Sequence, residues 1–174
     1  MKRSPCHLRP QAASSRVTME IKVRHLGDTQ FEAEARGHRV VSDQPPDNGG
    51  YDEGPTPPEF LLISLGTCVG FYIVQYLNAH SLDCPELEIN VAADKAKEPA
   101  RLGSFRIEVI APTVDPCHEA GVLRAVHKCL IHSTLLNPPA IETVVHCGAL
   151  QSYLGPAGGS GTRASAGRGR AASI

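Results

Sequence analysis

Residues 60–77, FLLISLGTCVGFYIVQYL, constrain the fold more than any other part of the chain. Apolar residues occupy nearly every position, with glycine and threonine beside Cys68. Because such a helix has no polar face to turn toward water, the pattern predicts a helix buried at the centre of the domain. Thr56 is a favourable N-cap, Pro57 suits the first helical position and Glu59 completes a capping box. We therefore expect the helix to begin at Pro57.

Four side chains of this helix form a stripe that contains the thiol. At about 100° per residue, one face carries Leu61, Ser64, Cys68 and Tyr72. The stripe places the thiol between a hydroxyl group and an aromatic ring. We take it as the candidate site.

Length and charge indicate the number of domains and the classes of partner to expect. A chain of 174 residues with 41% hydrophobic residues predicts one domain with a real core. The net charge of -1 lacks the basic excess of a nucleic-acid-binding domain. Residues 60–77 approach the length of a membrane span, but glycines, Ser64, Thr67 and a glutamine interrupt them and no basic flank follows. We expect neither nucleic acid nor membrane as a partner.

The N-terminal residues bear on the compartment. Residues 1–18 contain no apolar segment typical of a secretory signal. Their basic composition is compatible with an organellar transit peptide, but a disordered extension or an ambiguous start codon is the favoured interpretation. We expect a reducing cytoplasm, in which the six cysteines are mostly free thiols.

Alternating polar and apolar residues predict two groups of antiparallel strands. Residues 20–26 and 30–35 predict a hairpin, which residues 38–42 extend after Arg36-Gly37. A Pro/Gly/Asp loop at 45–58 leads into the helix. Residues 86–92 and 104–110 predict a second pair, with a polar loop at 94–102 between them.

The C-terminal half predicts a second helix and a last strand. Asp115-Pro116 is a favourable helix start, and Asn137-Pro138-Pro139 must end a helix that runs to about Leu135. Residues 141–147 predict a final strand. The expected order is βββ-α-ββ-α-β, an α+β domain with two core helices packed on antiparallel sheets. This domain covers residues 19–150, between the extension at 1–18 and a disordered Gly/Ser/Ala/Arg tail at 151–174.

A second cysteine lies on the second helix. Cys129 shares a face with Val122, Ala125 and Val126, so its side chain should point into the core. From the pattern alone, the simpler interpretation is that Cys68 and Cys129 are both small core residues.

The residues around Cys129 also suggest a metal site. In one continuous helix, however, His127 lies about 160° around the axis from Cys129. Only Cys129 and His132 could then share an ion, and no second ligand pair is evident. We expect no metal and no cofactor.

Several segments together resemble one family. They are Gly49-Gly50, the run GPTPPEFLL at 54–62, LGTC at 65–68 and Lys128-Cys129. In this order the sequence resembles the osmotically inducible protein C (OsmC) and organic hydroperoxide resistance (Ohr) family over residues 19–147. The resemblance implies an intertwined homodimer with thiol chemistry at the subunit interface. It also implies that Cys68 attacks an organic hydroperoxide, that Cys129 closes a disulfide on it and that an external dithiol reduces the pair.

The resemblance further implies a cation beside Cys68, because burial alone disfavours a thiolate. In the family an arginine of the N-terminal sheet supplies this charge and a glutamate positions it. Arg36 matches best, and Arg39 is the alternative. The family's glutamate stands ten residues before the first cysteine, where this chain has Pro58. Glu59, one residue later, is either catalytic or only a helix cap, and Glu53 is a further candidate.

Two functions from different classes remain open. The first is a cytoplasmic thiol peroxidase whose pocket for an apolar peroxide is lined by Leu61, Ser64, Phe71 and Tyr72. The alternative is a dimeric binding or redox-sensing module for an apolar ligand, without efficient peroxidase activity.

Overall fold

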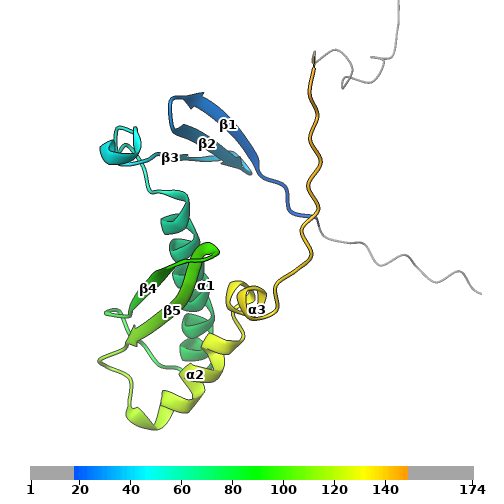
Figure 1. The fold of residues 1–174 in the computed structure, drawn as a ribbon. Coiled ribbons are helices and arrows are strands. Elements are labelled where there is room, and N and C mark those ends of the chain that lie inside the picture. Colours follow the sequence, from blue (N-terminus) through cyan, green and yellow to red (C-terminus); the bar gives the residue numbers. More distant parts are fainter. Residues whose placement is uncertain (1–17, 149–174) are drawn as a thin grey trace, which may run out of the picture. The chain divides into compact units, whose positions relative to one another are not determined.

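The structure is a computed structural model that describes residues 18–148 (Figure 1). Residues 18–138 lie within one compact unit, and residues 139–148 belong to a second. The first unit holds two antiparallel sheets and three α-helices, which confirms the predicted α+β class. The predicted tail, and all of the predicted extension except Thr18, lie outside the described residues.

The first sheet has the predicted order β1-β2-β3. Its strands are β1 (Lys22–Gly27), β2 (Gln30–Ala35) and β3 (His38–Ser42). Between β2 and β3, Arg36 and Gly37 have φ angles of 51° and 82°. Two residues with positive φ match the right-handed twist of a two-residue hairpin. The predicted hairpin and the strand that extends it are confirmed.

The two faces of this sheet differ in polarity. One face carries ion pairs in which Arg39 lies 3.8 Å from both Glu32 and Glu34. The register pairs Val23 with Ala33 and Ala33 with Val40, which puts an apolar row on the opposite face. Val23 and Val40 are largely exposed. The apolar face is thus incompletely covered in the single chain.

Asp43 holds together the loop that follows this sheet. Its side chain is fully buried and accepts hydrogen bonds from Thr29 Oγ1 at 2.8 Å and from the backbone N–H of Gln44, Tyr51 and Glu53 at 2.8, 3.0 and 3.2 Å. Burial alone would raise the pKa of this carboxyl group, but the donors together lower it far below its ordinary value. The carboxylate therefore fixes the path of the chain toward the central helix.

Replacing Asp43 with asparagine should lower the melting temperature by on the order of 10 °C at pH 7. The new amide group would point N–H donors at the donors that now bind the carboxylate. A depressed folded-state pKa contributes stability above the unfolded-state value of about 3.9, and this stability is lost as the pH falls through the folded-state value. Thermal unfolding from pH 7 to pH 2 should therefore show a weaker acid dependence in Asp43→Asn than in wild type. Asp47→Asn, at an exposed site in the same loop, is the control, and identical curves for wild type and Asp43→Asn would refute this role.

Helix α1 (Pro57–Ala79) begins where the sequence predicts. Glu59 Oε2 accepts hydrogen bonds from Thr56 N at 2.7 Å and from Thr56 Oγ1 at 2.8 Å. The backbone bond from Thr56, followed by the hydroxyl bond, lowers the pKa of Glu59. The predicted capping box is confirmed.

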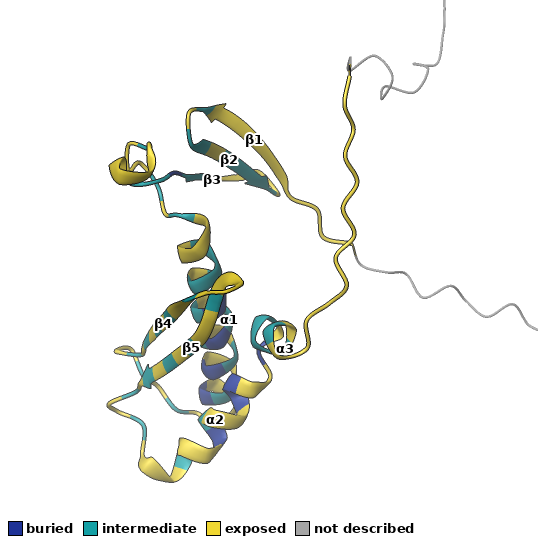
Figure 2. Cartoon of the chain, viewed as in Figure 1, coloured by how far each residue is buried: buried dark blue, intermediate teal, exposed yellow. Residues whose placement is uncertain are grey.

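The prediction that α1 is buried all round is wrong for the single chain. One stripe, Leu65, Val69, Ile73 and Leu77, is buried, as Figure 2 shows in dark blue. The reason is that α1 packs against β4, α2 and α3, which cover only this side. Another face carries Ile63, Phe71 and Val74, with 48%, 57% and 44% of their surface exposed.

By length and composition, α1 could cross a membrane, and it is the one such helix in the described part of the chain. Its buried stripe forms a core cluster with Val126 and Cys129 of the C-terminal segment. Packing of this kind is expected for a core helix.

The second sheet is a pair of strands longer than predicted. They are β4 (Glu88–Lys97) and β5 (Ala100–Ile110), and the pairing continues to Lys97 opposite Ala100. The loop predicted at 94–102 is therefore wrong. Ser104 Oγ donates to Asp94 Oδ2 at 2.8 Å, and the inward positions beyond this point include the small residue Ala96. Small and charged residues can continue a half-exposed antiparallel ladder without a strong apolar alternation.

The single helix predicted for the C-terminal half is two helices. A short 3-10 turn at Pro116–His118 leads into α2 (Glu119–His127), and α3 (Leu130–Leu136) follows. Asp115 caps the turn as expected, accepting from Cys117 N at 2.8 Å. At Cys129 the backbone leaves the helical conformation, with φ −59° and ψ 126°, and Cys129 caps α3. The predicted core face is retained, because Ala125, Val126 and Cys129 are buried.

Residues 141–147 do not form the predicted last strand. They are exposed and have no strand assignment in the structure. A strand requires hydrogen bonds to a neighbouring strand, and residues 139–148 contain no strand that could pair with them. The segment carries apolar residues suited to a strand, but it pairs with no strand within the described residues 139–148.

Candidate thiol site

The two predicted cysteines meet in the core. Cys68 is half-buried on α1 and packs against the core cluster that contains Cys129. Cys129 has 0% of its surface exposed at the break between α2 and α3. The Cys68 thiol is close enough to raise the pKa of the Cys129 thiol. Cysteines 61 positions apart in the sequence are thus in contact.

The environment of Cys129 favours its protonated form. Burial, and then the interaction with the neighbouring Cys68 thiol, raise the pKa of the Cys129 thiol, while the backbone N–H of His132 acts in the opposite direction. The His132 N–H donates to Cys129 Sγ at 3.4 Å. A thiol that stays protonated can donate its hydrogen to Cys68. The arrangement suits Cys68 as the sulfur that reacts first and Cys129 as the sulfur that follows.

The other residues of the predicted stripe differ in their surroundings. Leu61, Ser64 and Tyr72 are half-buried, as is Cys68. Phe71 is exposed and meets the Tyr72 ring edge to face, with ring centroids 5.3 Å apart. The prediction that all four line a substrate pocket stays a prediction.

Neither predicted arginine contacts Cys68 in the single chain. Arg36 is exposed at the β2–β3 turn, and Arg39 is held in the ion pairs with Glu32 and Glu34. Among residues 18–148, no hydrogen bond or ion pair connects either guanidinium group with the thiols. Within a single chain, neither arginine is therefore placed to stabilise a thiolate at Cys68.

The two candidate glutamates both have structural partners. Glu59 binds Thr56 at the start of α1. Glu53 Oε2 accepts from Gln30 Nε2 at 2.7 Å, and the same Gln30 amide donates to Asp43 at 3.3 Å. Glu59 performs the capping role considered for it, and its catalytic role stays a prediction.

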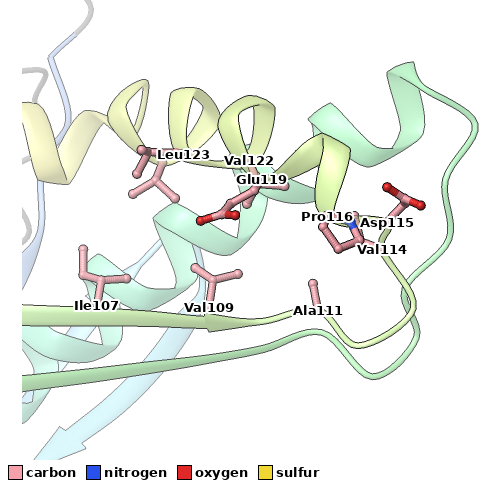
Figure 3. Close-up of a pocket in the computed structure, with 10 residues that line it drawn as sticks. Ile107, Val109, Ala111, Val114, Asp115, Pro116, Glu119, Val122 and Leu123 are labelled. Carbon is pink, nitrogen blue, oxygen red and sulfur yellow. The ribbon is translucent and has the colours of Figure 1, made fainter.

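Two pockets flank β5. A cavity of about 570 Å³ lies among α1, β5 and α3, and includes Leu61, Phe105 and His132. A second, of about 430 Å³, lies between β5 and α2, with the carboxylates of Asp115 and Glu119 among apolar side chains (Figure 3). Neither cysteine lines either pocket, but the first includes His132, whose backbone N–H donates to Cys129.

His132 is the site residue whose position the sequence did not reveal. The sequence pattern considered it only as a metal ligand on one continuous helix, and that geometry is wrong because the helix breaks at Cys129. The described residues contain no group of three or more His, Cys, Asp or Glu side chains that could hold a metal ion. The spacing of three residues from Cys129, typical of a capped helix start, is the signal that could have placed it.

The fold and the paired thiols define an α+β protein with a two-cysteine core site. The chain belongs to the OsmC-like protein family, whose model matches residues 50–144. No curated protein matches the sequence.

Solved structures share the fold. A protein of Psychrobacter arcticus described as an osmotic stress induced and detoxification response protein is 21% identical with a TM-score of 0.61, over 73% of this chain and 91% of that chain. An OsmC-like protein from Mycoplasma pneumoniae is 17% identical with a TM-score of 0.58, over 71% and 90%. An organic hydroperoxide resistance protein OsmC from Legionella pneumophila is 12% identical with a TM-score of 0.51, over 70% and 91%. At these identities the likeness shows the fold alone.

Proposed function

We propose that this protein is a cytoplasmic thiol peroxidase that reduces organic hydroperoxides through Cys68 and Cys129. The observation that carries the proposal is the contact between a half-buried thiol and a fully buried one at a helix break. The name of the Legionella pneumophila relative, an organic hydroperoxide resistance protein, agrees with this chemistry.

The reaction proceeds in two steps at the protein. The Cys68 thiolate attacks the terminal oxygen of the hydroperoxide, a sulfur–oxygen bond forms, and the oxygen–oxygen bond breaks. The alkoxide leaves and takes a proton to become the alcohol, which leaves Cys68 as a sulfenic acid. Cys129 then attacks the Cys68 sulfur and loses its proton, so that a disulfide forms and water departs. An external dithiol reduces this disulfide by exchange and becomes oxidised itself.

The exposed apolar faces support a homodimer. Ile63, Phe71 and Val74 of α1, and the Val23–Val40 row of the first sheet, are apolar surfaces that the single chain leaves open. Burying them in a second copy of the chain would stabilise the assembly. We propose that the dimer also brings Arg36 to Cys68, because Arg39 is already engaged by two carboxylates.

Replacing Arg36 with glutamine should slow the reaction of Cys68 with cumene hydroperoxide and with iodoacetamide at pH 7 by about tenfold, because the thiolate loses its cation. Stopped-flow kinetics under single-turnover conditions measures the first rate, and mass spectrometry of the alkylated protein measures the second. Arg39→Gln is the matched comparison. A larger loss in Arg39→Gln than in Arg36→Gln would show that the assignment of Arg36 is wrong.

A second candidate is a dimeric binding or redox-sensing module. It is favoured by Pro58, which stands where the family's peroxidases have a glutamate, and by the capping role of Glu59. Consumption of cumene hydroperoxide in the presence of excess dithiothreitol separates the two functions. A peroxidase oxidises one dithiol for each peroxide at a rate far above that of dithiothreitol alone, whereas a binding or redox-sensing module adds little to the rate of this background reaction.

A further inference from the structure

His132 has a buried ring nitrogen without a partner. Within the described residues 18–148, His132 Nδ1 is the buried side-chain nitrogen or oxygen that has no hydrogen bond. Buried polar atoms in folded proteins are nearly always paired, and an exception calls for an explanation. A proton on Nδ1 would be a buried donor with no acceptor, which is costly. The neutral ring therefore carries its proton on Nε2, where it is a hydrogen-bond donor.

His132 is one of the residues that line the cavity among α1, β5 and α3. This cavity of about 570 Å³ has walls from α1, β5 and α3 that include Leu61, Leu65, Phe105 and Leu135. These side chains are apolar, and His132 and Ser104 are the polar residues of the wall. Because the Ser104 hydroxyl already donates to Asp94, His132 is the polar side chain considered for a ligand. The volume lies within the range of pockets that hold small organic ligands.

The same residue connects the cavity to the reactive sulfurs. The backbone N–H of His132 donates to Cys129 Sγ at 3.4 Å, and Cys68 packs against the core cluster that contains Cys129. Leu61 and Leu65 lie seven and three positions before Cys68, on the same side of α1. Neither cysteine lines the cavity itself, but a molecule bound there would contact residues that adjoin both thiols.

We propose that this cavity binds the hydrocarbon part of the substrate and that His132 Nε2–H donates a hydrogen bond to the substrate's oxygen. The ligand class is an alkyl or aryl hydroperoxide, together with the alcohol formed from it. The identity of this ligand rests on the proposed function. His132 is then a specificity-determining residue, because the hydrogen bond selects an apolar molecule with an oxygen acceptor at one end.

Two substitutions separate the roles of the ring nitrogens. His132→Gln places an amide N–H close to the position of Nε2, whereas His132→Asn places one close to Nδ1. In peroxide turnover by the full-length protein, His132→Leu and His132→Asn should raise KM for cumene hydroperoxide about tenfold with kcat changed less than about twofold. His132→Gln should restore a KM close to that of wild type. Equal KM values in wild type and His132→Leu, or rescue by His132→Asn but not by His132→Gln, would overturn the assignment.

Ligand binding without turnover distinguishes this inference from the proposed function. Calorimetry with cumyl alcohol uses the Cys68→Ser protein with and without His132→Leu, and thermal unfolding verifies that both are folded. We expect the second substitution to weaken binding about tenfold. Histidine-dependent binding in a protein whose wild type lacks turnover would support the cavity and refute the peroxidase. Turnover in wild type with binding that is independent of His132 would do the reverse.

Discussion

The Cys68→Ser protein should lose turnover of cumene hydroperoxide with dithiothreitol by about a thousandfold or more, because a serine hydroxyl cannot form the thiolate that attacks the peroxide. The loss should appear in kcat/KM, since the first bond-making step disappears. Peroxide consumption is followed by a colorimetric assay at several protein concentrations. The thermal unfolding curve, measured in parallel, verifies that the variant is folded.

Cys84→Ser is the matched control for this substitution. Cys84 is also half-buried and packs against the same core cluster, but it lies outside the thiol pair. Its replacement should leave turnover close to that of wild type. Equal turnover in wild type and Cys68→Ser would exclude the peroxidase mechanism.

The Cys129→Ser protein should react once with peroxide and then fail to cycle efficiently. Without the neighbouring thiol, the sulfenic acid on Cys68 waits for an external thiol or oxidises further to sulfinic acid. Steady-state turnover should fall about tenfold or more, while the first reaction with peroxide remains. Intact-mass spectrometry should show a gain of about 32 Da on Cys68 under excess peroxide.

The result that would count against the resolving role is full turnover by Cys129→Ser with no sulfinic acid on Cys68. A double substitution of Cys68 and Cys129 separates the two sites, because it should show neither the first reaction nor the mass gain. The comparison assigns the first step to one sulfur and its resolution to the other.

Local sequence signals predicted the start of α1 well. Thr56 and Glu59 form a capping box whose partners are only three residues apart, so the sequence contains all the information it needs. The turn at Arg36-Gly37 was predictable for the same reason, because only these two residues separate the strand-like segments 30–35 and 38–42 in the sequence. Elements set by neighbouring residues are those that a sequence describes most directly.

The break at Cys129 was not predictable from these signals. No proline interrupts residues 119–136, the glycine in this range, Gly121, lies eight positions before the break, and the apolar face continues through the break. The chain turns there because Cys129 caps α3, a choice that depends on packing against α1 rather than on local propensity. The extension of β4 and β5 to Lys97 and Ala100 was missed because small and charged residues pair there without a strong alternation.

The candidate site was predictable in part. The position of Cys68 on an apolar helix follows from the pattern, and the pairing with Cys129 came from the resemblance to the family. The sequence predicted burial for the face of α1 that is exposed in the single chain, and it did not place Arg36 beside Cys68. In the proposed dimer both features depend on the second chain. His132 was assigned to one continuous helix because the break at Cys129 was not predicted.

Mapping the product of one oxidation tests the central claim most directly. The reduced protein is treated with one equivalent of cumene hydroperoxide, its remaining thiols are alkylated, and it is digested without reductant. We predict a mass loss of about 2 Da in the intact protein and a disulfide-linked pair of peptides that contain Cys68 and Cys129. A disulfide between any other pair of cysteines, or unmodified Cys68 after the peroxide has been consumed, would contradict the account.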